Sequence, residues 1–185
     1  PLIFFSIKYD LRILKNYGLI FLLVCFQGFI GWYMVSSGLI DRVDVSHYRL
    51  SLHLVTAFII LSVIFWKFLK LTKIKTIYTS INISLVRFFL FLLFLQLIIG
   101  AFVSGMDAGR VYNTWPMMGS SYFPDDSQFI EFLNLKVFDN PSIVQFIHRN
   151  LAYLIVGIYI YILLFTIVGK NEVLRKPIIV IGVSL

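Results

Sequence analysis

Two histidines lie within long apolar stretches, where an ionisable side chain is costly and is usually functional. His53 is seven residues into a helix expected to begin near Ser46, and His148 is seven residues after Pro141. At 1.5 Å per residue, each imidazole is expected about 10 Å in from the start of its helix. A buried neutral imidazole is a good axial ligand for haem iron, and the alternative is a hydrogen bond between helices. A zinc site is not expected, because no second His, Cys or carboxylate occurs at ligand spacing within these stretches.

Small and polar residues around the two histidines fit the same chemistry. Ala57 and Ala152 follow one helical turn later on the same face and would leave room for a flat macrocycle. Arg49 and Arg149 lie at the edge of the apolar stretches, where an arginine can pair with a propionate or extend to lipid headgroups. Gln145 precedes the second histidine by three residues, so it could hydrogen-bond that histidine or a ligand, or help to cap the start of the helix.

The pattern around the histidines occurs twice in the same order. A Gln-x-x-x-Gly motif comes first, and a His-x-x-x-Ala-aromatic motif follows in the next apolar stretch; the copies are Gln27 to Gly31 with His53 to Phe58, and Gln96 to Gly100 with His148 to Tyr153. Small residues let helices approach closely in lipid, and glutamines can hydrogen-bond between helices. This repeated order predicts that the chain contains a helical hairpin twice. The alternative is that the two stretches match only because membrane helices share a similar composition.

Composition indicates the elements that must position these residues. The chain has 185 residues, of which 59% are hydrophobic and 14% charged, and its mean hydropathy is +0.91. These values exclude a soluble enzyme, a disordered tail and a nucleic-acid module. A membrane helix needs about 20 apolar residues, and four stretches qualify, approximately 17–36, 50–69, 88–105 and 141–169. A fifth apolar run begins at Pro177, so we predict an all-α polytopic membrane protein with four full spans and parts of two more.

The distribution of basic residues predicts the orientation. Segments 1–16, 67–87 and 170–176 carry 11 Lys and Arg, whereas segments 37–49 and 106–149 carry five. The positive-inside rule assigns the first group to the cytoplasmic or matrix side. The formal charge of +7 therefore reflects topology and anionic lipid, and no nucleic-acid partner is expected.

The repeat and the spans suggest two domains. Residues 1–80 would form the second half of an N-terminal four-helix bundle, and residues 81–185 the first part of a C-terminal one. The chain starts without Met on apolar residues, so we expect an internal piece of a longer protein. The outer loop 106–140 is long for a connector, and it either simply connects two spans or covers a site. Within it, Phe129, Phe132, Leu133 and Val137 recur at helical spacing, which predicts a short amphipathic helix on the membrane surface.

Several stretches resemble the heme A synthase family, and the resemblance covers nearly the whole chain. They are GWYMV with GL at 31–39, VS with YRL at 45–50, HL at 53–54, DAG at 107–109, YNT with Pro116 and Met118, NP at 140–141 and QFIHR at 145–149. The resemblance implies eight helices in two pseudo-symmetric four-helix bundles, each using a pair of histidines. It assigns His53 to the haem O substrate site and His148 to haem b as an axial ligand.

The implied reaction oxidises the C8 methyl of haem O to a formyl group, which gives haem A for cytochrome oxidase. Heme O synthase and oxidase subunits would be the protein partners, and the bilayer the surroundings. The family's catalytic Glu and the partner histidines have no counterpart in these residues, so the catalytic residue is unknown and the piece alone is expected to be inactive. The Ile, Phe and Lys content favours a bacterial cytoplasmic membrane, with the mitochondrial inner membrane as the alternative.

Two rival classes can be separated from this function. A bis-His b-type electron-transfer cytochrome would carry one haem type and would need no covering loop, so the long loop disfavours it. A transporter or structural subunit would usually show carboxylates or broken helices within its spans, and no acid lies in the four stretches.

Overall fold

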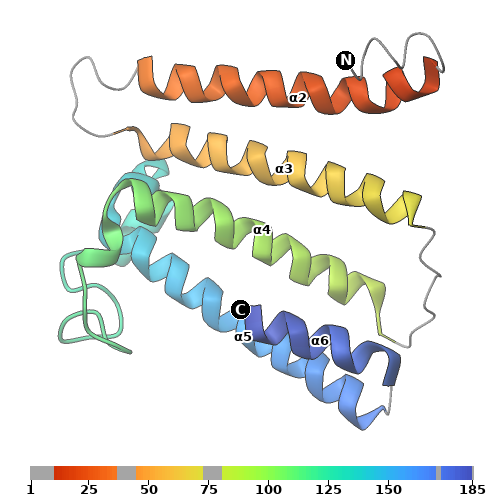
Figure 1. The fold of residues 1–185 in the computed structure, drawn as a ribbon. Coiled ribbons are helices and arrows are strands. Elements are labelled where there is room, and N and C mark those ends of the chain that lie inside the picture. Colours follow the sequence, from red (N-terminus) through yellow and green to blue (C-terminus); the bar gives the residue numbers. More distant parts are fainter. Residues whose placement is uncertain (1–10, 37–44, 73–80, 170–171, 185) are drawn as a thin grey trace. The chain divides into compact units, whose positions relative to one another are not determined.

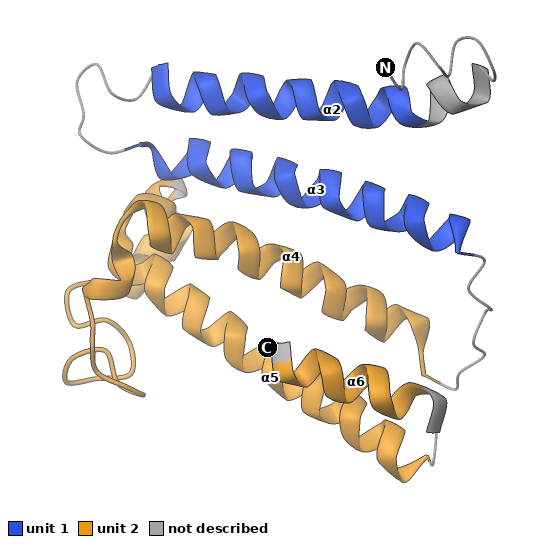
Figure 2. Ribbon diagram, in the orientation of Figure 1, with its two compact units in different colours: residues 1–74 blue, residues 75–185 orange. Residues whose placement is uncertain are grey.

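The computed structural model describes residues 11–36, 45–72, 81–169 and 172–184 (Figure 1). Within these residues the regular structure is helical, apart from an isolated bridge between Met118 and Ser121. Four of the helices are long and apolar enough to cross a membrane, which confirms the all-α membrane-spanning prediction. The chain divides into two compact units, residues 1–74 and 75–185 (Figure 2).

The first unit is an antiparallel hairpin of two long helices. Helix α2 spans Leu11–Ser36 and α3 spans His47–Leu71, and the two pack along their length. Hydroxyl groups on α3 bond back to its own carbonyls: Thr56 donates to Leu52 and Ser62 donates to Phe58. These bonds satisfy polar groups that hydrocarbon could not. The outward faces carry exposed Leu, Phe and Trp side chains, as expected for helices solvated by lipid.

The second unit contains three helices. Helix α4 spans Ile83–Gly105, α5 spans Pro141–Val168 and α6 spans Glu172–Ser184, with α5 packed against both others. One apolar cluster fills the end distant from the long loop, and it contains Phe89, Leu92, Ile155, Ile162 and Ile178. A second cluster, of Ile99, Phe102 and Val144, lies next to the loop. Packing in this unit therefore fixes the α4–α5 pair at both ends.

Asparagine caps start both of the long helices of this unit. The Asn82 side chain accepts a hydrogen bond from Ser84 N, and the Asn140 side chain accepts from Ser142 N and Ile143 N. Pro141 occupies the first turn of α5, where its missing N–H costs nothing. The start expected for the helix carrying His148 is thereby confirmed.

One predicted element differs from the structure. The apolar run that begins at Pro177 lies within α6, which starts earlier, at Glu172. The predicted amphipathic helix is wrong: the segment forms two short 3₁₀ helices, η2 at Phe129–Leu133 and η3 at Leu135–Asp139. Asn134 separates them, because its side chain caps the second by accepting from Lys136 N. A third 3₁₀ helix, η1 at Ala108–Arg110, follows Asp107, whose φ of 51° is left-handed.

Candidate functional site

His53 contacts the neighbouring helix of its hairpin at two residues. Gln27 on α2 donates a hydrogen bond from Nε2 to the His53 carbonyl oxygen at 3.0 Å, and the same nitrogen is 3.2 Å from both ring nitrogens. A Cβ added to Gly31 would lie 3.1 Å from His53 Cε1. The glutamine therefore anchors the ring, and the glycine leaves the space that the ring occupies.

His148 makes the same contacts in the second unit. Gln96 on α4 donates from Nε2 to His148 Nε2 and to its carbonyl oxygen, both at 3.3 Å. A Cβ on Gly100 would lie 3.3 Å from His148 Cε1. Within the described residues, His148 Nδ1 and Gln96 Oε1 are buried without a hydrogen-bond partner. The repeated sequence motif thus corresponds to a repeated contact: Gln and Gly on one helix enclose the imidazole of the next.

Arg149 and Gln145 face the long loop. The Arg149 guanidinium donates to the carbonyl oxygens of Tyr112 at 2.7 Å, Thr114 at 2.8 Å and Met117 at 3.4 Å. Gln145 is 4% exposed; its amide donates to the carbonyls of Gly109 and Tyr112 and accepts from Tyr112 N. In this structure both residues dock the loop on the turn of α5 that carries His148, and their printed hydrogen bonds go to the loop and not to the imidazole.

A second set of polar contacts holds the far part of the loop on the start of α5. Ser142 donates to the Asp126 carboxylate at 2.7 Å, and Asn140 donates to Glu131 at 2.9 Å and to Ser127 at 3.2 Å. Burial alone would raise the pKa of Asp126, but hydrogen bonds from Ser142, Tyr112 and Ser127 outweigh it and lower the pKa. Sequence reasoning missed this set, because the partners are distant in the chain and only the Asn140 cap had a local signal.

Aromatic side chains complete the docking of the loop. Tyr122, Phe123 and Phe132 pack around Phe146, with ring centroids 5.1–6.4 Å apart. Tyr122 also donates to Asn150 at 2.5 Å, and Trp115 donates to the Tyr153 hydroxyl at 2.7 Å. The loop therefore covers α5 from Ser142 to Tyr153, which includes the turn of His148.

Comparison with known proteins identifies the family of the chain. The family model described as Cytochrome oxidase assembly protein matches residues 1–185. The chain belongs to this family. It is 46% identical to a heme A synthase of Pelagibacter ubique over its whole length, and 38% identical to one of Rickettsia bellii, covering 55% and 57% of those proteins. A heme A synthase of Flavobacterium johnsoniae is 39% identical over 88% of the chain. The resemblance to the heme A synthase family is thus confirmed.

The chain spans about half the length of the curated relatives it matches. No solved structure matches it. With four membrane-length helices in its described residues and such relatives, this member of the family is a multi-pass membrane protein. Whether its units belong to two four-helix bundles stays a prediction.

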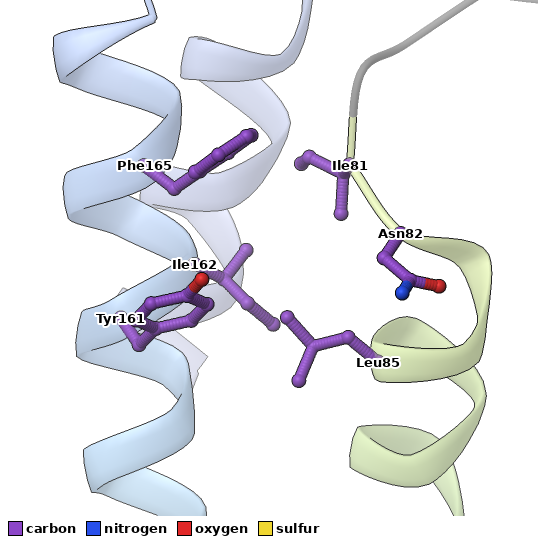
Figure 3. Close-up of a pocket in the computed structure, with 6 residues that line it drawn as sticks. All are labelled: Ile81, Asn82, Leu85, Tyr161, Ile162 and Phe165. Atoms are coloured by element: carbon purple, nitrogen blue, oxygen red, sulfur yellow. The ribbon is translucent and has the colours of Figure 1, made fainter.

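Other features of this family member lie outside the histidine contacts. Arg49 places its guanidinium 5.0 Å from the centre of the Tyr33 ring, so in this structure it is part of a cation–π pair. Among the described residues no group of three or more His, Cys, Asp or Glu could hold a metal ion. A pocket of about 170 Å³ lies at the end of α4 and α5 distant from the loop (Figure 3). Its lining includes Asn82, Tyr161 and Phe165, so it is separate from His148.

Proposed function

We propose that the whole protein is a heme A synthase, which oxidises the C8 methyl of haem O to a formyl group for cytochrome oxidase. The observation that supports this most is the repeated Gln–Gly–His contact, because it supplies one similarly held imidazole in each unit. The printed names of the relatives agree with it. Heme O synthase and oxidase subunits are the protein partners that this reaction implies.

The residues present fit haem ligation. His148 has a buried ring nitrogen without a partner, and glycine lies where a larger side chain would displace the ring. A neutral imidazole of this kind suits haem iron. In our proposal His148 holds haem b and His53 holds the haem O substrate. Haem b supplies one-electron redox chemistry when it is bound.

The protein's own residues orient the ligands and cover one site. Gln96 and Gln27 anchor the two histidines, and Gly100 and Gly31 admit their rings. The docked loop contacts residues on both sides of His148 in the sequence, through Gln145 and Arg149. Arg149 holds the loop through three carbonyls, so three of its five N–H donors are used for docking and the others are left for a propionate.

Histidine substitutions in the full-length protein test the proposal. We expect His148→Ala to lose haem b, and His53→Ala to keep haem b but to make no haem A. Ser62→Ala is a matched control, since Ser62 lies on α3 and bonds only to its own helix in this structure. The measurement is the mass and absorption spectrum of haem extracted from purified protein.

The extracted haem also distinguishes the rival function. Haem b together with haem O, haem A or a hydroxylated form supports the synthase, whereas haem b alone favours a bis-His b-type cytochrome. Normal haem content and haem A output in both histidine variants would refute the site assignment. We place the protein in a bacterial cytoplasmic membrane, since the relatives named above are bacterial; fractionation of native membranes tests this.

A further inference from the structure

The short helix η2 carries three exposed apolar side chains among its five residues. Phe129 is 74% exposed, Ile130 64% and Leu133 83%. Single exposed apolar residues are normal on a protein surface, but a contiguous group usually marks a surface that meets a partner. We call these three residues the apolar tip, and we propose that it inserts into the outer leaflet of the bilayer, where headgroups meet acyl chains. This lipid contact is independent of the proposed enzymatic activity.

The local structure of η2 directs the apolar tip outward. A 3₁₀ helix has three residues per turn, so Ile130 and Leu133 lie on the same side of it. Phe132 lies on another side and is half-buried, with its ring centroid 6.4 Å from that of Phe146 on α5. The turn therefore docks through Phe132 and presents the apolar tip away from this contact.

The structure divides the apolar residues that the sequence pattern had grouped on one helical face. Phe132 and Val137 turn inward, and Val137 is buried. Phe129 and Leu133 remain exposed and are joined by Ile130, which the helical spacing did not include. Contact with the bilayer surface therefore does not require the predicted amphipathic α-helix, because one 3₁₀ turn gathers the side chains that would enter it.

The charged groups beside the apolar tip suit a lipid surface. The Glu131 carboxylate accepts hydrogen bonds from Gln128 N at 2.8 Å and from the Asn140 side-chain amide at 2.9 Å. The acid of η2 is therefore bonded toward the start of α5. Lys136 on η3 is exposed, and a lysine at a bilayer surface can extend its ammonium group to lipid phosphates.

The apolar tip lies at the level where two spans meet the outer surface. Phe138 on η3 packs against Phe102 in the last turn of α4, with ring centroids 5.8 Å apart, and η2 is bonded to Asn140, the cap of α5. Helix α4 has 23 residues, about 35 Å at 1.5 Å per residue, so its ends lie near the two surfaces of a hydrocarbon core about 30 Å thick. The sparse Lys and Arg of segment 106–149 place this end outside. At such a boundary, amphipathic segments bury apolar side chains about 5–10 Å deep.

Spin labelling of the full-length protein in phospholipid nanodiscs tests the insertion. A nitroxide is attached at Leu133→Cys, in protein whose Cys25 is replaced by Ser and whose cysteines elsewhere, where present, are also replaced. Molecular oxygen concentrates among acyl chains and a nickel chelate stays in water, so the ratio of their collision rates with the label reports its surroundings. We expect the label at position 133 to collide more with oxygen than with nickel.

Arg110→Cys is the matched control in the same loop. Arg110 and Asp107 form an ion pair at 3.7 Å with side chains 85% and 73% exposed, as expected for groups in water. A label at position 110 should therefore collide more with nickel than with oxygen. If Leu133→Cys does not fold, Ile130→Cys places the label on the same side of η2 and should give the same preference for oxygen.

Two results would overturn the proposal. A label on the apolar tip that prefers nickel, as the one at position 110 does, would show that the tip lies in water. A label that neither reagent reaches would show that the tip is covered by another part of the protein or by a second copy.

Discussion

Adding one methyl group at Gly100 should damage the His148 site. A Cβ there would lie 3.3 Å from His148 Cε1, tighter than most real Cβ contacts, so the imidazole must move by a few tenths of an ångström. In the first unit, Gly31→Ala is tighter still, at 3.1 Å from His53 Cε1. We therefore expect both substitutions to disturb the histidine rings through packing alone, with no polar group removed.

The size of the effect follows from two opposing contributions. Overpacking a close contact costs about 1–3 kcal/mol. Replacing glycine by alanine within a helix contributes up to about 1 kcal/mol in the other direction. If the whole cost of overpacking is borne by the haem-bound position of the imidazole, haem affinity falls by roughly 5- to 150-fold, at about 1.4 kcal/mol for each factor of ten.

Two other glycines separate packing from helix propensity. A Cβ at Gly28 on α2 or at Gly157 on α5 would meet nothing within 4 Å. We expect Gly28→Ala and Gly157→Ala to retain haem binding and to unfold at an equal or higher temperature. The assay is haem b titration of the full-length protein, with the midpoint of thermal unfolding measured alongside. Equal haem affinities for Gly100→Ala and Gly157→Ala would refute the reasoning.

Three further predictions concern the loop and the start of α5. Arg149→Ala should speed amide hydrogen exchange in residues 109–118 by roughly 10- to 150-fold, because a hydrogen bond to a charged group contributes about 1.5–3 kcal/mol; exchange at the wild-type rate would contradict the docking. The lowered pKa of Asp126 means that its contribution to docking is present above the ordinary pKa, about 3.9, and is lost as pH falls through the lower folded value. Loop exchange, corrected for its intrinsic pH dependence, should therefore be constant from pH 7 to about 5 and rise only in stronger acid, and Asp126→Asn should abolish that rise. Asn140→Ala should lower stability by about 0.5–2 kcal/mol through loss of the helix cap, measured as a fall in unfolding temperature relative to the exposed control Ser62→Ala.

The spans were predictable from the sequence because a bilayer imposes a length and a polarity on each helix. Predicted helix ends lie within a few residues of the observed ones at α3, α4 and α5. The start of α5 was predicted most securely, since Asn140 and Pro141 act locally through the backbone.

The histidine contacts of the candidate site could be predicted from the sequence, whereas the contacts of the loop could not. His53 and His148 are conspicuous because each is an imidazole in an apolar stretch, and the matching Gln and Gly could be seen through the repeat. The roles of Arg149 and Gln145 could not be predicted from the sequence. Their partners are backbone carbonyl groups of residues 109–117, and every residue has such a group whatever its side chain. The same applies to Asp126 and Ser142, whose contact depends on how a long loop folds back.

The two hairpins share one part of this design and differ in another. Gln, Gly and His meet in both units, so the positioning of an imidazole is the repeated property. The arginine that docks the loop has no equivalent in the first hairpin, because Arg149 follows His148 whereas Leu54 follows His53. Because Gln145 and Arg149 flank His148 on one turn of α5, hydrogen bonds to them also fix the backbone of that turn. In our proposal this fixed turn suits a resident cofactor, haem b, at His148, whereas His53 holds the substrate haem O, which must enter and leave.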